Sequence, residues 1–206
     1  MKNRRGLSRS ILSIACLYFI SSVHATTPPS AKPIAVKKAG QWSAVPAQSQ
    51  LQFNFIQAGT SAQGVFKKHT ADFVFSPTDL ANARIDVTID MASSNSGDSE
   101  RDELLRSKDL FAVQQYPQSR FVAQGFEKIG VDQYRTQAQL TLRGVTKTLP
   151  YTFTLVMDPK QADQFQLKST TTIKRLEFGV GQGDWKTTEW IPNDVVVLVN
   201  LRAKRN

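Results

Sequence analysis

Apolar and polar side chains alternate with a period of two through most of this 206-residue chain. In the clearest run, Ile85, Val87 and Ile89 are apolar, whereas Asp86 and Thr88 between them are polar. Such alternation is typical of antiparallel strands that turn one face to the core and the other to water. Similar runs occupy residues 51–55, 71–75, 134–142, 151–157 and 165–173, and residues 195–201 are apolar on both faces except at one asparagine.

Turn-forming residues separate the alternating runs. They comprise Ser76-Pro77-Thr78-Asp79, Gly130, Arg143-Gly144-Val145, Asp158-Pro159 and Gly181-Gln182-Gly183-Asp184. No long stretch with helical periodicity is available to connect parallel strands. The sequence therefore predicts an all-β fold, either a sandwich or a barrel.

Residues 97–107 depart from this pattern. They are rich in helix-forming side chains, Asp98 or Ser99 can cap a helix, and acidic residues follow in its first turn. We expect a short helix here, and a second turn that ends before Pro117 because the residue before proline disfavours helix. The apolar side of this segment consists of Leu104, Leu105, Leu110 and Phe111.

The first 41 residues resemble an export signal and a linker. Basic residues at the start, a short apolar run from Ile11 to Ile20 and small side chains before Ala25 predict a signal peptide over 1–25, cleaved after Ala25. Residues 26–41 are rich in Pro, Thr, Ala and Lys, which predicts a flexible leader before a folded domain over 42–206. The expected location is the periplasm, and no later segment is apolar enough to form a stable membrane span.

Removal of the signal peptide would also change the charge and the number of residues suited to catalysis or metal binding. The net charge falls from +9 to +5, and Cys16 and one of the two histidines leave. The remaining charge is weak evidence for nucleic acid, so no nucleic-acid partner is expected. His69, in the polar segment Lys67-Lys68-His69, is interpreted as a solvated turn residue. Without a nucleophile motif or a metal-binding cluster, the sequence predicts no cofactor, no metal site and no enzyme.

The apolar faces carry much aromatic bulk. A closed sheet of about eight strands is either filled by its own side chains or holds one small apolar ligand. The aromatic residues on these faces are Phe53, Phe55, Phe66, Phe73, Phe75, Phe121, Phe153, Phe165 and Phe178. The inward positions also include small or polar residues that would leave space, namely Ala71, Thr136, Ala138, Ser169 and Thr171.

Four segments that follow one another along the chain carry a further signal. They are Ser49-Gln50-Leu51-Gln52-Phe53 followed by Gly64-Val65-Phe66; Ile85 to Asp90 followed by Arg101 to Phe111, Tyr116-Pro117 and Ser119-Arg120-Phe121; Leu140-Thr141-Leu142-Arg143-Gly144-Val145-Thr146-Lys147; and Arg175 to Trp185. Together they resemble the YceI-like family of periplasmic polyisoprenoid-binding proteins. The resemblance runs from about Trp42 to Ala203. It implies an eight-stranded antiparallel lipocalin-like β-barrel with one short helix, whose apolar tunnel holds a polyprenyl phosphate or an isoprenoid quinone.

On this interpretation the alternating strands supply the ligand-binding residues. The expected lining consists of Leu51, Phe53, Phe55, Phe73, Ile85, Val87, Ile89, Phe121, Leu140, Leu142, Phe153 and Leu155. Arg101 and Arg106 are candidate partners of the lipid head group, although Arg101 would equally fit an ion pair within the helix. The family often has histidine where this chain has Gln57 and Leu104, which leaves the head-group preference open.

Three other interpretations remain open at this point. The protein could be an enzyme acting on a lipid or a small ester. It could be a stress-related structural or interaction protein whose barrel is packed solid and binds no ligand. An exposed sheet edge would also allow two copies to pair as a homodimer.

Overall fold

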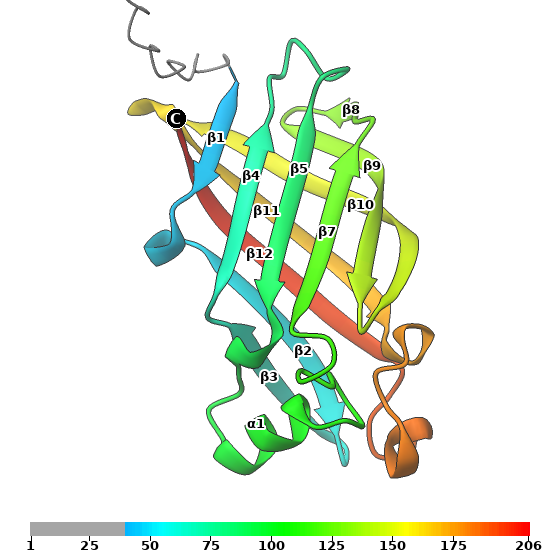
Figure 1. Cartoon of the computed structure of the whole chain (residues 1–206). Coiled ribbons are helices and arrows are strands. Elements are labelled where there is room, and N and C mark those ends of the chain that lie inside the picture. Colours follow the sequence, from blue (N-terminus) through cyan, green and yellow to red (C-terminus); the bar gives the residue numbers. More distant parts are fainter. Residues whose placement is uncertain (1–39) are drawn as a thin grey trace, which may run out of the picture. The chain divides into compact units, whose positions relative to one another are not determined.

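The computed structural model describes residues 40–206, which form twelve strands and one α-helix (Figure 1). The strands are β1 (Gln41–Ala44), β2 (Gln50–Gln57), β3 (Thr60–Phe66), β4 (His69–Val74), β5 (Arg84–Asp90), β6 (Ser94–Asn95), β7 (Gln118–Gln124), β8 (Glu127–Gly130), β9 (Gln133–Leu142), β10 (Val145–Asp158), β11 (Gln161–Lys174) and β12 (Asp194–Arg205). The helix is α1 (Ser99–Arg106), and short 3-10 turns cover Pro46–Gln48, Met91–Ser93, Arg175–Phe178 and Gly183–Lys186. The predicted signal peptide and nearly all of the predicted leader lie outside the described residues.

Eight antiparallel strands close into a barrel in the order β1-β4-β5-β7-β9-β10-β11-β12, with β12 pairing back onto β1. This confirms the predicted eight-stranded antiparallel barrel with one short helix. The long strand β12 pairs with β1 through Ala203–Arg205 and with β2 through Val196–Asn200. The hairpin of β2 and β3 therefore extends the wall beyond the end of β1, and β3 meets β6 only at Val65 and Phe66.

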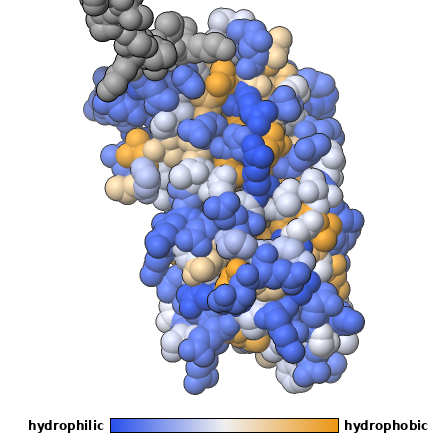
Figure 2. All heavy atoms as spheres, viewed as in Figure 1, coloured by the Kyte–Doolittle hydropathy of each residue, from blue (hydrophilic) through white to orange (hydrophobic). Residues whose placement is uncertain are grey.

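The two ends of the barrel differ in what covers them. The β2–β3 hairpin and α1 lie at one end, here called the helix end, while β1 and β8 lie at the other (Figure 1). On the face shown in Figure 2 the surface is mainly hydrophilic, with apolar side chains scattered among polar ones. This agrees with the period-two pattern, because alternate residues of each strand face water.

Aromatic side chains fill the end of the barrel away from α1, here called the packed half. Phe75 contacts Tyr134 edge-on with ring centroids 5.0 Å apart, and Trp42 contacts Phe165 in the same way at 4.9 Å. The indole nitrogen of Trp42 donates to the carbonyl of Phe75 at 3.0 Å, so this polar group is satisfied inside the core. The predicted small inward residues Ala71, Thr136, Ala138 and Ser169 are buried here, where the neighbouring rings take up the space that their small side chains leave.

The helix α1 forms where the sequence predicts it. The Asp98 side chain accepts a hydrogen bond from the Arg101 amide at 2.9 Å and caps the first turn. Asp102 is buried, which opposes its charge, but hydrogen bonds from the amide and hydroxyl of Ser96 and the nearby charge of Arg106 lower its pKa below its usual range. Asp102 therefore ties α1 to the segment that follows β6.

Asp86 on the outer face of β5 is predicted to make stability depend on pH. The hydrogen bond from Arg120 is the main reason that its pKa falls to about 2, and Arg84 contributes. Because the folded pKa lies below the unfolded value of 3.8, this stabilisation is present above pH 4 and is lost as the pH falls through 2. We expect Asp86→Asn to reduce stability by about 1 kcal/mol at pH 7, since both arginines are partly exposed to solvent.

The measurement is the melting temperature of both proteins from pH 7 to pH 2. The gap between wild type and Asp86→Asn should close over the acid limb, whereas Glu103→Gln, at an exposed position of α1, should show little gap at any pH. A gap that persists unchanged at pH 2 would contradict the assignment.

Gly64 is required for β3 to pack against β2. It pairs with Phe53 across the two strands, and a Cβ atom at this position would overlap the Phe53 ring. That ring is held by Phe66 and Phe111, so it has little room to move. We expect Gly64→Ala to destabilise the protein by about 1–3 kcal/mol in denaturant unfolding, through overpacking. The control is Gln63→Ala at the exposed neighbouring position, which should change stability by less than about 0.5 kcal/mol. Equal losses of stability in the two variants would refute this explanation.

Candidate ligand-binding cavity

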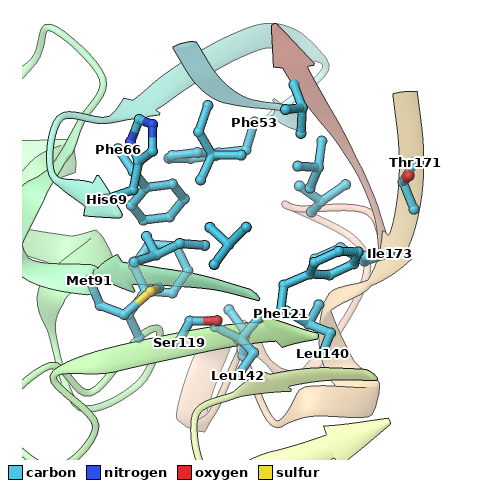
Figure 3. A pocket seen from close by; sticks show the side chains of 18 of the residues that line it. Phe53, Phe66, His69, Met91, Ser119, Phe121, Leu140, Leu142, Thr171 and Ile173 are labelled. Carbon is cyan, nitrogen blue, oxygen red and sulfur yellow. The ribbon is translucent and has the colours of Figure 1, made fainter. Parts of the chain in front are cut away.

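The half of the barrel nearer to α1 encloses a cavity of about 190 Å³ (Figure 3). Its wall is almost entirely apolar and is built from β2, β3, β4, β5, β7, β9, β10, β11, β12, α1 and the loops beside them.

The floor of the cavity is the surface of the packed half that faces the helix end. Five residues belong both to the aromatic core and to the cavity lining, namely Phe73, Ile85, Tyr151, Leu167 and Leu201. The Tyr151 hydroxyl donates to Ser169 at 2.9 Å, and burial raises its pKa to about 12. The floor is therefore uncharged at neutral pH, and the cavity ends blindly at the aromatic core.

A second aromatic group covers the cavity beside α1. Phe53 lies 5.0 Å from Phe66 and 6.2 Å from Phe111 between ring centroids, which joins the β2–β3 hairpin to the loop after α1. Leu104 and Leu105 of α1 complete this side. The lining is more exposed here than at the floor, since Phe55 and Leu104 are only half-buried.

Polar groups meet the cavity at the helix end. The Arg101 Nε atom donates to the Gln57 side-chain oxygen at 3.0 Å, and both residues line the cavity. The ion pair within the helix that the sequence suggested for Arg101 is absent among residues 40–206. Gln57 and Leu104, the two positions that depart from the resemblance, both lie on the cavity wall beside Arg101.

Arg175 holds a loop, residues 176–193, against the same end of the barrel. It is 3% exposed, and its five N–H groups donate to the carbonyls of Val180, Trp185, Thr187, Ile191 and Pro192 at 2.7–3.1 Å. Burial lowers its pKa, but a guanidinium stays charged at neutral pH. Arg175 therefore fixes the loop that places Val180 and Ile191 in the cavity wall.

The structure brings most of the predicted lining together. Leu51, Phe53, Phe55, Phe73, Ile85, Val87, Ile89, Phe121, Leu140 and Leu142 all line the cavity. Phe153 and Leu155 do not, because they lie further along β10 and are buried in the packed half. Arg106 also lies elsewhere, since it donates to the carbonyls of Ala92 and Ser94 and contacts Asp102 at 3.9 Å.

The sequence interpretation missed several lining residues. His69 is the first residue of β4 and contributes to the cavity wall beside Phe66, with its Nδ1 atom buried (Figure 3), so its interpretation as a solvated turn residue is wrong. Pairing with Ile89 turns the side chain inward despite the two preceding lysines. Val195, Val197 and Val199 of β12 were missed because that strand is apolar on both faces, which hides its orientation.

Neither a metal-binding cluster nor a membrane-spanning helix is found among residues 40–206. No group of three or more histidine, cysteine, aspartate or glutamate side chains is arranged to hold a metal ion in this part of the chain. Among the same residues, no helix has the length and apolar character needed to span a bilayer.

Comparison with known proteins agrees with this architecture. A UPF0312 protein of Pseudomonas putida strain W619 is 29% identical over 154 residues, which cover 72% of this chain and 76% of that protein. A UPF0312 protein of Photorhabdus laumondii is 39% identical over 84 residues, which cover 41% and 43% of the two chains.

Solved structures share the fold. Burkholderia cenocepacia BcnA superposes with a TM-score of 0.74 at 28% identity and covers 78% of this chain and 99% of its own. A polyisoprenoid binding domain from Saccharophagus degradans implicated in plant cell wall breakdown gives a TM-score of 0.63 at 16% identity, covering 80% and 98%.

A family match covers nearly all of the barrel. The YceI-like domain matches residues 42–203, which run from the first strand of the barrel almost to the end of the last. The chain belongs to the YceI-like family.

Proposed function

We propose that this chain is a periplasmic binding or carrier protein for polyisoprenoid-type lipids, either a polyprenyl phosphate or an isoprenoid quinone. The observation that carries the proposal is an apolar cavity that is closed by the aromatic floor at one end and lined by polar groups at the other. This gradient suits an amphiphile whose tail points inward. The Saccharophagus degradans relative of the same fold is described as binding polyisoprenoids, which fits the proposal.

The tail of the ligand would occupy the cavity with its last unit against Phe73 and Tyr151. The void of about 190 Å³ is larger than the engineered cavity of about 150 Å³ that holds benzene. Each buried methylene contributes ~0.8 kcal/mol, so about ten buried carbons gain on the order of 8 kcal/mol before the cost of association. Longer tails would continue along the half-buried valines of β12 toward the helix end.

The head of the ligand would lie at the helix end. Arg101 lines the cavity there, and among residues 40–206 its side chain pairs only with the neutral side chain of Gln57, so its guanidinium is placed to contact a polar head. We assign no such role to Arg106, because its donors are directed at main-chain carbonyls.

The proposed activity is binding without catalysis. Ser119, a hydroxyl that lines the cavity, donates to the carbonyl of Thr141 at 2.7 Å, so it is not poised against a base. A broad hydrolase screen of wild type and His69→Ala should show no activity in either protein. Activity that disappears with His69→Ala would favour an enzyme instead.

Location and physiological role form part of the proposal. Export by a signal peptide cleaved after Ala25 would place the barrel in the periplasm, where an insoluble lipid needs shielding from water. A role in stress, in transport or in storage is compatible with such a carrier, and two copies could pair through the part of the β3 edge that β6 leaves uncovered within residues 40–206.

Native mass spectrometry of the protein purified gently from its own cells tests the proposal. We expect an adduct with the mass of an isoprenoid lipid, and uptake of polyprenyl lipids by the delipidated protein. A protein that is free of ligand and also takes up no polyprenyl lipid in vitro would contradict it.

A further inference from the structure

The charged side chains that line the cavity are all cationic. Arg101 and Arg175 contribute to the wall, and no aspartate or glutamate among residues 40–206 does so. The only other titratable side chains in the lining are His69 and Tyr151, and neither is a carboxylate that could balance the charge of the arginines. Every charged side chain on the cavity wall is therefore positive.

Hydrogen bonds connect the two arginines through the tip of the β2–β3 hairpin. Arg101 donates to Gln57, and the next residue, Ala58, donates its amide to the Trp190 carbonyl at 2.8 Å. Trp190 precedes Ile191, whose carbonyl accepts from Arg175 at 2.7 Å. Both arginines therefore lie at the helix end, near the tip of the same hairpin.

Neither arginine has a carboxylate partner. Within the described part of the chain, all ion pairs involve other cations, such as Arg120 with Asp86 and Arg135 with Glu127 on the outer surface. Arg175 donates to carbonyl oxygens, and the Arg101 side chain donates to the amide oxygen of Gln57. Of the acids near Arg101, Asp98 caps the helix, Asp102 accepts hydrogen bonds from Ser96, and Glu100 and Glu103 are exposed to solvent.

An uncompensated charge beside a low-dielectric space attracts a counter-charge strongly. The attraction between unit charges rises several-fold when water is replaced by protein, and a guanidinium matches the geometry of phosphate and carboxylate oxygens. All five N–H groups of Arg175 are used, so it can act only through its field, whereas Arg101 has its two Nη atoms free of hydrogen bonds within residues 40–206.

We propose, resting on the lipid-binding function above, that the cavity selects amphiphiles with an anionic head, phosphate or carboxylate, over neutral amphiphiles with the same tail. Arg101 contacts the head, and Arg175 adds a long-range attraction without touching it. The open question between a polyprenyl phosphate and a quinone is thereby decided for the charged ligand.

The test compares matched ligands on the delipidated full chain. Farnesyl phosphate and farnesol share one tail, as do palmitate and hexadecanol, and isothermal titration gives the affinity ratio within each pair. We expect the anion to bind at least about tenfold more tightly than the alcohol, with a ratio that decreases at high salt. A preference in both pairs assigns the site to anionic heads in general, whereas a preference for farnesyl phosphate alone assigns it to prenyl phosphates.

Variants separate the head-group contact from the fold. Arg101→Gln should reduce the ratio to within about threefold of unity, Arg101→Lys should retain most of it, and Arg135→Gln on the outer surface should leave it unchanged. Equal affinity for farnesyl phosphate and farnesol in the wild type overturns this inference while the lipid-binding function stands. No uptake of any of the four amphiphiles overturns both.

Discussion

Val197→Trp is expected to abolish lipid uptake while the barrel stays folded. Val197 lies near the start of β12, pairs with Phe53 of the neighbouring strand β2, and lines the cavity. An indole ring is larger than a valine side chain by about the volume of a small apolar ligand, so it would occupy the space that the tail needs. Because the ring enters an existing void, it should disturb packing less than an insertion into a filled core does.

The matched control for this change is Val196→Trp. Val196 is the neighbouring residue on the same strand, and alternation directs its side chain away from the cavity. Titration with a polyprenyl lipid should show at least about a hundredfold loss of affinity for Val197→Trp and less than about threefold for Val196→Trp. Similar affinities for the two variants would mean that the lipid does not occupy this cavity.

Arg175→Met should cause the largest loss of stability among single changes at the helix end. The substitution leaves five carbonyls of residues 180–192 without their donor, inside a region that the arginine fills almost completely. Each buried acceptor that loses its partner costs about 1–3 kcal/mol, although water entering the loop recovers part of this. A net loss of about 3–5 kcal/mol would lower the melting temperature by roughly 10 °C.

Two neighbouring variants separate the hydrogen bonds of Arg175 from its charge. Arg175→Lys keeps the charge but offers three donors instead of five, so most of the loss should remain. Lys174→Met, at an exposed residue that pairs with Asp194, should leave the melting temperature almost unchanged, because solvent screens this ion pair. A melting temperature for Arg175→Met within 2 °C of wild type would show that the loop is held by other contacts.

The fold could be predicted from local pattern because strands obey a simple period. Ile85, Val87 and Ile89 alternate so regularly that their inward orientation follows from the sequence alone, and the structure agrees. The start of α1 was similarly readable, with Asp98 as one of two candidate caps, since the capping interaction involves residues only three positions apart. The twofold use of β12, by β1 and then by β2, depends on long-range pairing and has no local signal.

The division of the barrel into a packed half and a hollow half was not readable. Along β10, Leu149 and Tyr151 line the cavity, whereas Phe153 and Leu155, with the same alternation, lie beyond its floor. Alternation reports which face a side chain takes, but its height along the barrel axis depends on how the strands are staggered. Phe153 and Leu155 were assigned to the lining for this reason.

The polar groups at the helix end show the same limit. The five acceptors of Arg175 come from residues up to 17 positions away, and no sequence pattern marks a carbonyl as a partner. For His69, the adjacent lysines suggested solvent, and only the pairing of β4 with β5 shows that it faces inward. Arg101 could be singled out by its motif, but its partner Gln57 is 44 residues away.

A crystal structure of the protein loaded with a polyprenyl lipid tests the central claim most directly. The account predicts continuous density for the tail between Phe53 and Phe121, with its last isoprene unit against Tyr151 and its head beside Arg101 at the helix end. Lipid density on the outer surface, or an empty cavity in a crystal whose protein carries stoichiometric lipid in solution, would contradict it.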